Sequence, residues 1–370
     1  MSDSVLSEYL MSCRMYSKHI VAVLLMIVTG PVLAQEKLVE KIEVFPPSVQ
    51  LDSSRDFQSI VVQATRNDGV TEDVTIRAEM AFKHSELAAL ERVESDAGTL
   101  VRLSPKLDGD TALVVSYGGQ QVELPVRVRS AATEPPLSFR MDVMPVFARA
   151  GCNMGSCHGA ARGKDGFRLS LFGFDPAGDY HRLTREMPGR RINLANPAGS
   201  LLVQKAVGEV PHTGGKRFEK DSELANRLIR WITAGATDDP KAGKELPKLL
   251  AVDLYPPTSL LEGDRATQQL VAVARFSDGT DRDVTDLVWY GSNNDSSVAI
   301  NASGNTASGQ RGESFVMARY DTITVGVPVV VIPEKMTFSY PETEGNTWID
   351  DLVDNKLKSL RIAPSEVCND

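Results

Sequence analysis

The stretch NDGVTEDVT, residues 67–75, returns as SDGTDRDVT at residues 277–285, and this repeat decides the fold of most of the chain. Ahead of the first copy, small apolar residues alternate with their neighbours over 60–65, which is the two-residue period of a β-strand. The Asp-Gly pair inside each copy is a hairpin turn signal. The repeat therefore predicts two copies of one β-unit.

The repeat continues upstream with the same spacing, because VFPPS at 44–48 matches LYPPT at 254–258. Each copy has the length of a small β-sandwich of the immunoglobulin type. The later strands predicted in the two copies are 111–117, 122–128, 314–320 and 322–332.

Between the copies lies the sequence GCNMGSCHG, residues 151–159. Two cysteines followed at once by a histidine are similar to the C-x-x-C-H attachment signature of c-type haem, although four residues separate these cysteines instead of two. In that signature the sulfurs form thioethers with the haem, and the histidine ligates its iron. We therefore predict that Cys152 and Cys157 bind one haem c covalently, with His158 as the proximal iron ligand.

The second axial ligand is predicted to come from the loop after the motif. Pro211 and the glycines of Thr213–Gly215 flank His212, which makes His212 the first candidate, and Met187 and His181 are its competitors. The sixth position could also be open. Four basic residues could pair with haem propionates or form an ordinary solvated surface, namely Arg190, Arg191, Lys216 and Arg217.

Two other interpretations of the motif stay open at this point. Cys152 and Cys157 could form a disulfide hairpin beside an idle histidine. The same cysteines, with His158 and His212, could instead supply four ligands to zinc. We find no serine–histidine–aspartate order, phosphate loop or paired-carboxylate arrangement, so we predict no catalytic residue.

The N-terminus has the pattern of a secretory signal peptide, residues 1–34. A basic flank precedes the apolar run 20–28, and Val32–Ala34 offers small residues for cleavage. The run is short for a membrane span, although an uncleaved anchor is the alternative. We predict export to the periplasm or cell surface, with no stable transmembrane span after cleavage. The net charge of −9 in 370 residues argues against nucleic acid as a partner.

The segment between the repeats has helical signals. Pro145 suits the first turn of a short helix, Leu201–Lys205 can form a helix after an Asn-Pro turn, and a capped amphipathic helix is predicted from Ser222 to Gly235. Another amphipathic helix is predicted over 348–357 near the end of the chain. The fold class expected is all-β plus all-α, with two sandwiches around a small, mainly helical domain. The predicted units are 39–129, 138–237, 248–333 and an incomplete domain at 344–370.

These pieces together resemble large exported proteins of planctomycetes, which carry group-2 bacterial Ig-like domains (BIG2), a cytochrome c-like haem domain and a region called DUF1549. The resemblance rests on DVT and VWYGS at 283–292, on the haem stretch with GFRLSL at 166–171, and on WITAGA at 231–236. It implies that Trp289 is the buried core tryptophan of the second sandwich. It also implies that residues 344–370 begin a DUF1549 domain, which would make the chain a piece of a longer protein.

The function predicted from these observations is one-electron transfer by an exported c-type cytochrome-like protein with an unknown redox protein partner. Such a chain is more an electron-transfer protein than a self-contained enzyme. The alternative is a cell-surface structural or carbohydrate-binding protein with a Cys152–Cys157 disulfide and no haem. Surface polysaccharide is a candidate partner in either case.

Overall fold

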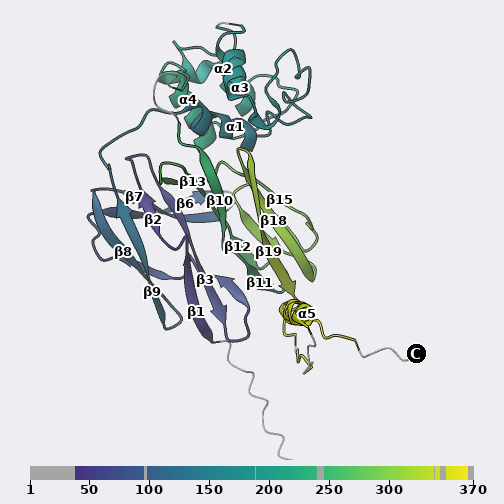
Figure 1. Cartoon of the computed structure of the whole chain (residues 1–370). Coiled ribbons are helices and arrows are strands. Elements are labelled where there is room, and N and C mark those ends of the chain that lie inside the picture. The colour runs from purple at the N-terminus through teal and green to yellow at the C-terminus, as the bar shows by residue number, and fades with distance from the viewer. Residues whose placement is uncertain are drawn as a thin grey trace, which may run out of the picture. The chain divides into compact units, whose positions relative to one another are not determined.

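The computed structural model describes residues 38–95, 98–187, 189–239, 246–336, 338–341 and 347–365, and these described residues belong to one compact unit (Figure 1). The predicted signal peptide, residues 1–34, lies outside the described residues. Among the described helices, none is long and apolar enough to cross a membrane.

The first repeat folds into two packed sheets. One sheet has the strand order β1-β3-β7-β6 with β4 beside β3, and the other has the order β2-β9-β8-β5. Its core is apolar, and Ile60, Leu103 and Leu113 are fully buried there. The strands are β1 (Val39–Phe45), β2 (Val49–Leu51), β3 (Gln58–Arg66), β4 (Thr71–Asp73), β5 (Glu79–Phe82), β6 (Ala88–Ser95), β7 (Gly98–Pro105), β8 (Gly109–Tyr117) and β9 (Gln120–Val128).

The second repeat has the same plan, although its first layer is divided into two smaller sheets. The strand orders are β10-β13-β14, β12-β17-β16 and β11-β19-β18-β15. The strands are β10 (Leu249–Tyr255), β11 (Ser259–Glu262), β12 (Thr267–Gln269), β13 (Val271–Phe276), β14 (Asp281–Asp283), β15 (Trp289–Ser292), β16 (Val298–Ile300), β17 (Asn305–Ser308), β18 (Gly312–Tyr320) and β19 (Ile323–Ile332). All four later strands predicted from the sequence are confirmed.

The segment between the repeats contains short helices joined by turns. They are α1 (Met144–Arg149), α2 (Pro176–Thr184), α3 (Leu201–Val207) and α4 (Glu223–Thr233), with single turns at Phe139–Val143, Leu171–Gly173 and Pro197–Gly199. The helices predicted at Pro145, at 201–205 and from Ser222 are confirmed. The Ser222 side chain caps α4 by accepting a hydrogen bond from the Ala225 amide at 3.3 Å.

The predicted fold class, in which two sandwiches flank a separate helical domain, is wrong. The described chain is predominantly β, and most of the segment between the repeats is turn and loop around helices of 6 to 11 residues. One continuous apolar cluster joins residues of these helices, such as Trp231, to residues of the second repeat, such as Val316. The helices are too short to enclose a core of their own, so they complete it against the neighbouring sheets.

The two repeats contact each other through corresponding positions. The Asp283 carboxylate accepts a hydrogen bond from the Ser59 amide, and the matching Asp73 carboxylate accepts one from the Gln269 amide at 2.9 Å. Phe45 and its counterpart Tyr255 stack with ring centres 5.6 Å apart. Val61, Val271 and Val273 form a small buried cluster of their own.

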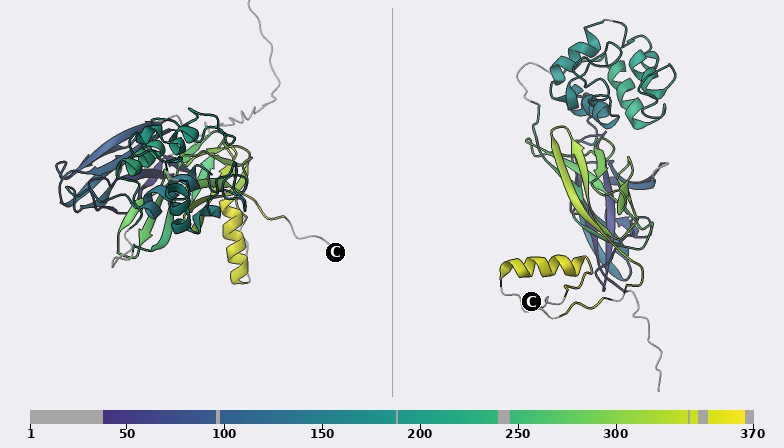
Figure 2. Two further views of the ribbon diagram at one scale, coloured as in Figure 1. Left: turned by 90° about the horizontal axis from the view of Figure 1, so that it is seen from above. Right: turned by 90° about the vertical axis from the view of Figure 1, so that its right-hand side faces the viewer.

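The helix predicted near the C-terminal end is confirmed as α5 (Trp348–Ser359). In the right-hand view of Figure 2, α5 lies at the opposite end of the sandwiches from the other helices, and none of its residues is buried. The expectation that Trp289 is a buried core residue is wrong, because its side chain is 38% exposed and the next residue, Tyr290, is buried instead. A strand exposes alternate residues, and Trp289 lies on the outer face of β15.

Candidate functional site

The motif loop follows α1 directly and is closed by backbone hydrogen bonds. The amide of His158 donates to the Cys152 carbonyl at 2.9 Å, and the amide of Gly159 donates to the Met154 carbonyl at 3.0 Å. A Cβ atom on Gly159 would fall 2.1 Å from the Asn153 carbonyl oxygen, so only glycine fits this close approach. The glycine after the histidine is therefore a requirement of the loop itself.

A cavity of about 390 Å³ opens beside this loop, within the usual size range for a small-molecule site. Side chains from the motif, from the turn at 164–169, from α3 and from α4 line it. They include Cys152, His158, Phe167, Leu169, Leu202, Ala206, His212, Phe218 and Leu228. The apolar residues make the walls. The polar lining consists of the two histidines together with Lys164, Asp165, Arg190, Arg191 and Lys205.

The predicted ligands His158 and His212 both line this cavity and lie close together. Their ring centres are 6.1 Å apart, and the ring planes differ by 11°. Metal–imidazole bonds are about 2.0–2.1 Å long, so two imidazoles on opposite sides of one metal have centres about 6 Å apart. The observed separation matches that of two axial ligands.

Each histidine is oriented by a hydrogen bond through Nδ1. The Nδ1 atom of His158 lies 3.0 Å from the Phe167 carbonyl oxygen, and that of His212 lies 2.9 Å from the Gly215 carbonyl oxygen. A carbonyl oxygen only accepts, so both Nδ1 atoms carry the proton and both Nε2 atoms are left with a free lone pair. Burial lowers the pKa of His158, which favours this neutral, ligating form.

Other contacts fix the His212 loop against the motif. Thr213 donates a hydrogen bond to Asp165 at 2.6 Å, and Arg217 Nε donates to the Ala150 carbonyl at 2.7 Å. Arg191 lies over the Phe167 ring, with its guanidinium carbon 4.5 Å from the ring centre. Asp165 was not predicted from the sequence as a site residue, although Gly163 and Gly166 on either side of it indicate a turn.

The two predicted thioether cysteines differ in position. Cys152 lines the cavity, and burial raises the pKa of its thiol to about 11. Cys157 is half-buried and is not among the lining residues. Both thiols are free in this structure. The competing ligand Met187 lines the same cavity but is 47% exposed, while His181 is exposed and does not line it.

The prediction of zinc as an alternative is wrong. Within the described part of the chain, no group of three or more histidine, cysteine, aspartate or glutamate side chains is placed to hold a metal ion. A structural zinc site needs four such ligands in a tetrahedron. Cys152, Cys157, His158 and His212 are therefore not arranged as a four-ligand metal site in the described structure.

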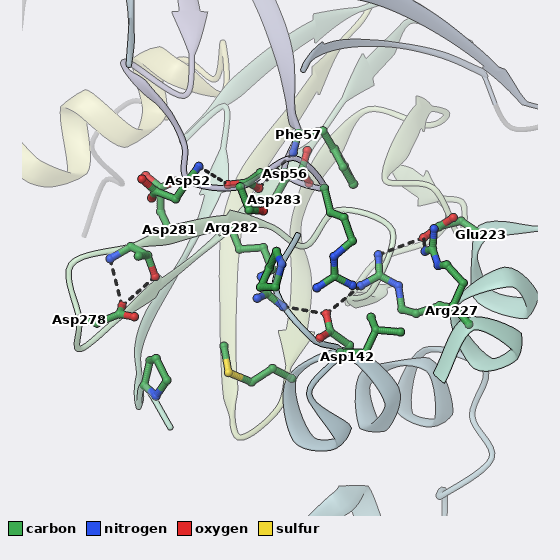
Figure 3. Close-up of a pocket in the computed structure, with 18 of the residues that line it drawn as sticks. Asp52, Asp56, Phe57, Asp142, Glu223, Arg227, Asp278, Asp281, Arg282 and Asp283 are labelled. Atoms are coloured by element: carbon green, nitrogen blue, oxygen red, sulfur yellow. Dashed lines mark hydrogen bonds and ion pairs between the residues drawn. The ribbon is translucent and has the colours of Figure 1, made fainter. Parts of the chain in front are cut away.

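A second cavity, of about 520 Å³, lies where the two repeats and the segment between them meet. Figure 3 shows its charged lining, in which the Asp142 carboxylate accepts from Arg227 at 3.3 Å and from Arg282 at 3.0 Å. Burial raises the pKa of Asp56 and of Asp281 to about 6. Asp142 and Glu223 form ion pairs with three arginines of this lining, Arg227, Arg230 and Arg282, which indicates a structural role for that part of the cavity.

No family model matches the chain, and no curated protein matches it. The predicted membership of the planctomycete family with group-2 Ig-like, cytochrome c-like and DUF1549 domains is therefore wrong: no family match supports it, and the helices do not form a cytochrome-like domain.

Solved structures similar to the chain include domains 5–6 of the S-layer protein SbsC, at 11% identity and a TM-score of 0.30, covering 81% of this chain and all of that one. Domains 4 and 5 of SbsC match at 18% identity and a TM-score of 0.21, and the match covers 25% of this chain and 54% of that structure. Mouse clustered PcdhgC3 EC1-3 matches at 10% identity and a TM-score of 0.18, covering 79% and 67% of the two chains. Scores this low do not assign a fold.

Proposed function

We propose that the chain is an exported, β-rich surface protein whose cavity between His158 and His212 binds one haem c. The observation that carries this proposal is the pair of imidazoles, 6.1 Å apart, each with Nδ1 bonded to a carbonyl oxygen and Nε2 left free. The proposal rests on this geometry and does not use the family resemblance. A surface location agrees with the N-terminal sequence pattern and with the S-layer proteins named above.

The chemistry of the lining fits a flat, apolar ring with an iron at its centre. Phe147, Leu169 and Phe218 supply apolar walls, and Cys152 brings a sulfur to the cavity edge. Lys205 and Arg190 line the same cavity and could face the acidic edge of a porphyrin. Cys157 lies outside the lining, so a second thioether requires its side chain to turn toward the cavity.

Bound haem supplies a one-electron couple whose potential depends on its axial ligands and on burial. The residues of this chain orient the two imidazoles through their Nδ1 hydrogen bonds, and burial favours the neutral form of His158. Two histidine ligands would leave no open coordination position on a bound haem, which would favour electron transfer to another redox protein over catalysis.

The test is the intact mass of the exported protein, produced in a host with c-type maturation machinery. We expect a gain of one haem that survives denaturation. Substituting His212→Ala or His158→Ala should change the absorption spectrum of the bound haem, whereas His181→Ala, at an exposed position outside the cavity, should not. A mass equal to that of the bare polypeptide would contradict the proposal.

A second candidate is the purely structural surface protein. The interlocked contacts between the repeats favour it, because Asp73 and Asp283 join them in both directions. In this case the mass would be that of the polypeptide less two hydrogens, because Cys152 and Cys157 would form a disulfide.

A further inference from the structure

We propose that a small cavity between the motif loop and the second repeat binds a single neutral pyranose unit, free or at the end of a glycan. This site is separate from the histidine cavity. Its volume is about 180 Å³, and its lining is Ala148, Asn153, Met154, Phe172, Trp289, Arg319 and Asp321. The space suits one six-membered ring and not a longer stretch of chain.

The amide side chain of Asn153 is the first reason to expect a ligand. Asn153 is only 1% exposed, yet neither its Oδ1 nor its Nδ2 has a hydrogen-bond partner in the protein. A buried donor and a buried acceptor without partners destabilise the native state unless a ligand or water satisfies them. The backbone holds the residue in place, since the Asn153 carbonyl accepts from the Phe172 amide at 3.0 Å.

The second reason is the exposed aromatic wall. Trp289 is 38% exposed although it lies in a strand, β15, at the edge of this cavity. A Cβ atom on Gly291 would fall 2.4 Å from Trp289 Cη2, so the glycine lets the indole lie against its own strand. The ring is thereby held in one orientation, with a face available for stacking.

The charges around the cavity favour a neutral occupant. The Arg319 guanidinium carbon lies 3.8 Å from the centre of the Phe172 ring, so the cation site over that ring is already taken. Asp321 adds a carboxylate, which is 3.6 Å from Arg140 in an ion pair. Arg319 and Asp321 contribute one charge of each sign to the lining, so this pair gives the cavity no net charge that would select a cation or an anion.

A pyranose ring carries both the polar groups and the apolar face that this lining can bind. Its hydroxyl groups both donate and accept, so two neighbouring hydroxyls can satisfy both orphaned atoms of the Asn153 amide. Its C–H face is apolar and can stack on the Trp289 indole. Arg319 and Asp321 can bond further hydroxyls as donor and acceptor.

Binding can be tested by isothermal titration calorimetry of the whole exported protein with methyl glucopyranoside, methyl mannopyranoside, methyl galactopyranoside and a glucose hexamer. We expect saturable binding of at least one methyl glycoside. Trp289→Ala should weaken that binding at least tenfold. The matched control is Trp348→Ala, which removes an exposed tryptophan of α5 and should leave binding unchanged. Equal binding of the hexamer would identify a glycan end as the source, and binding of the methyl glycoside alone would identify a free sugar.

Asn153→Leu separates a binding role from a structural one. If the amide awaits a ligand, the variant should bind sugar at least tenfold more weakly without loss of unfolding free energy, because an apolar group of similar size replaces two unsatisfied atoms. The proposal is overturned if no glycoside shows saturable binding, or if Trp289→Ala and Asn153→Leu bind as well as the native protein.

Discussion

At the scale of single residues, the motif loop is defined by a glycine as much as by its cysteines and histidine. The backbone of Asn153 passes so close to Gly159 that no side chain has room there. This contact sets where His158 leaves the loop, because the His158 amide is bonded to Cys152 in the same turn. The spacing of the motif is therefore a consequence of backbone packing in addition to any ligand chemistry.

We expect Gly159→Ala to lower the free energy of unfolding by at least about 2 kcal/mol, because the added methyl group forces the backbone of the loop to move. Gly155→Ala in the same loop is the matched control, since a Cβ there would meet only Leu171 at an ordinary 3.8 Å. Urea unfolding of both variants measures the difference. Equal midpoints for the two would show that the loop is not close-packed.

At the scale of elements, two helices with similar caps differ in what they contact. Ser222 caps α4, whose Leu228, Trp231 and Ile232 are at most 1% exposed. Thr347 caps α5 through a capping box with Asp350, yet α5 buries none of its residues. Helix stability reaches the rest of the protein only through a packed face.

Removing each cap should therefore give different results. Ser222→Ala should lower the global free energy of unfolding by about 1 kcal/mol, the usual value of a lost cap. Thr347→Ala should leave the main unfolding transition unchanged. It should reduce only the part of the helical circular-dichroism signal that disappears at temperatures below that transition. A shift of the main transition in the Thr347 variant would mean that α5 is coupled to the core.

At the scale of the whole molecule, buried charge collects where the repeats and the helical segment meet (Figure 3). Burial above all raises the pKa of Asp281 to about 6, and the nearby charge of Asp52 adds to it, while a hydrogen bond from Gln50 at 3.4 Å and the charge of Arg275 oppose the shift. Between pH 4 and 6 the native state keeps a proton that the unfolded chain has lost. Stability from this group is thus full below pH 4 and is lost as the pH rises through 6.

Asp281→Asn removes that titration, so the variant should be more stable than the native protein at pH 7 by about 1 kcal/mol, after allowing for partial exposure of the group. The advantage should vanish at pH 4, where the aspartate is protonated in both states. Thermal unfolding from pH 4 to 8 measures it, with Asp264→Asn, at an exposed position outside the cavity, as control. An advantage that persists at pH 4 would assign it to packing.

The sequence predicted local structure better than it predicted how the parts combine. The Asp-Gly repeats, Ser222 and the late strands are local signals, and each predicted its element correctly. The family resemblance implied that Trp289 is buried, but in this chain it lies on the outer face of β15 and is 38% exposed. The helical segment was predicted to be a separate domain. The periodicity of an amphipathic helix identifies its apolar face but does not identify the element that packs against that face. The pairing of His158 with His212 depended on loop conformation, yet both residues were named.

The reciprocal contacts between the repeats also bear on the history of the chain. Where each of two like units uses the same patch to hold the other, the arrangement is that of an isologous homodimer related by a two-fold axis. Asp73 with Gln269, and Asp283 with Ser59, are such a pair of exchanged contacts. The protein has the form of an ancestral dimer fused into one polypeptide, with the histidine-bearing segment inserted at the join. After such a fusion the sequences of the two halves could change independently. Among the described residues, only the second repeat shares an apolar core with the inserted segment.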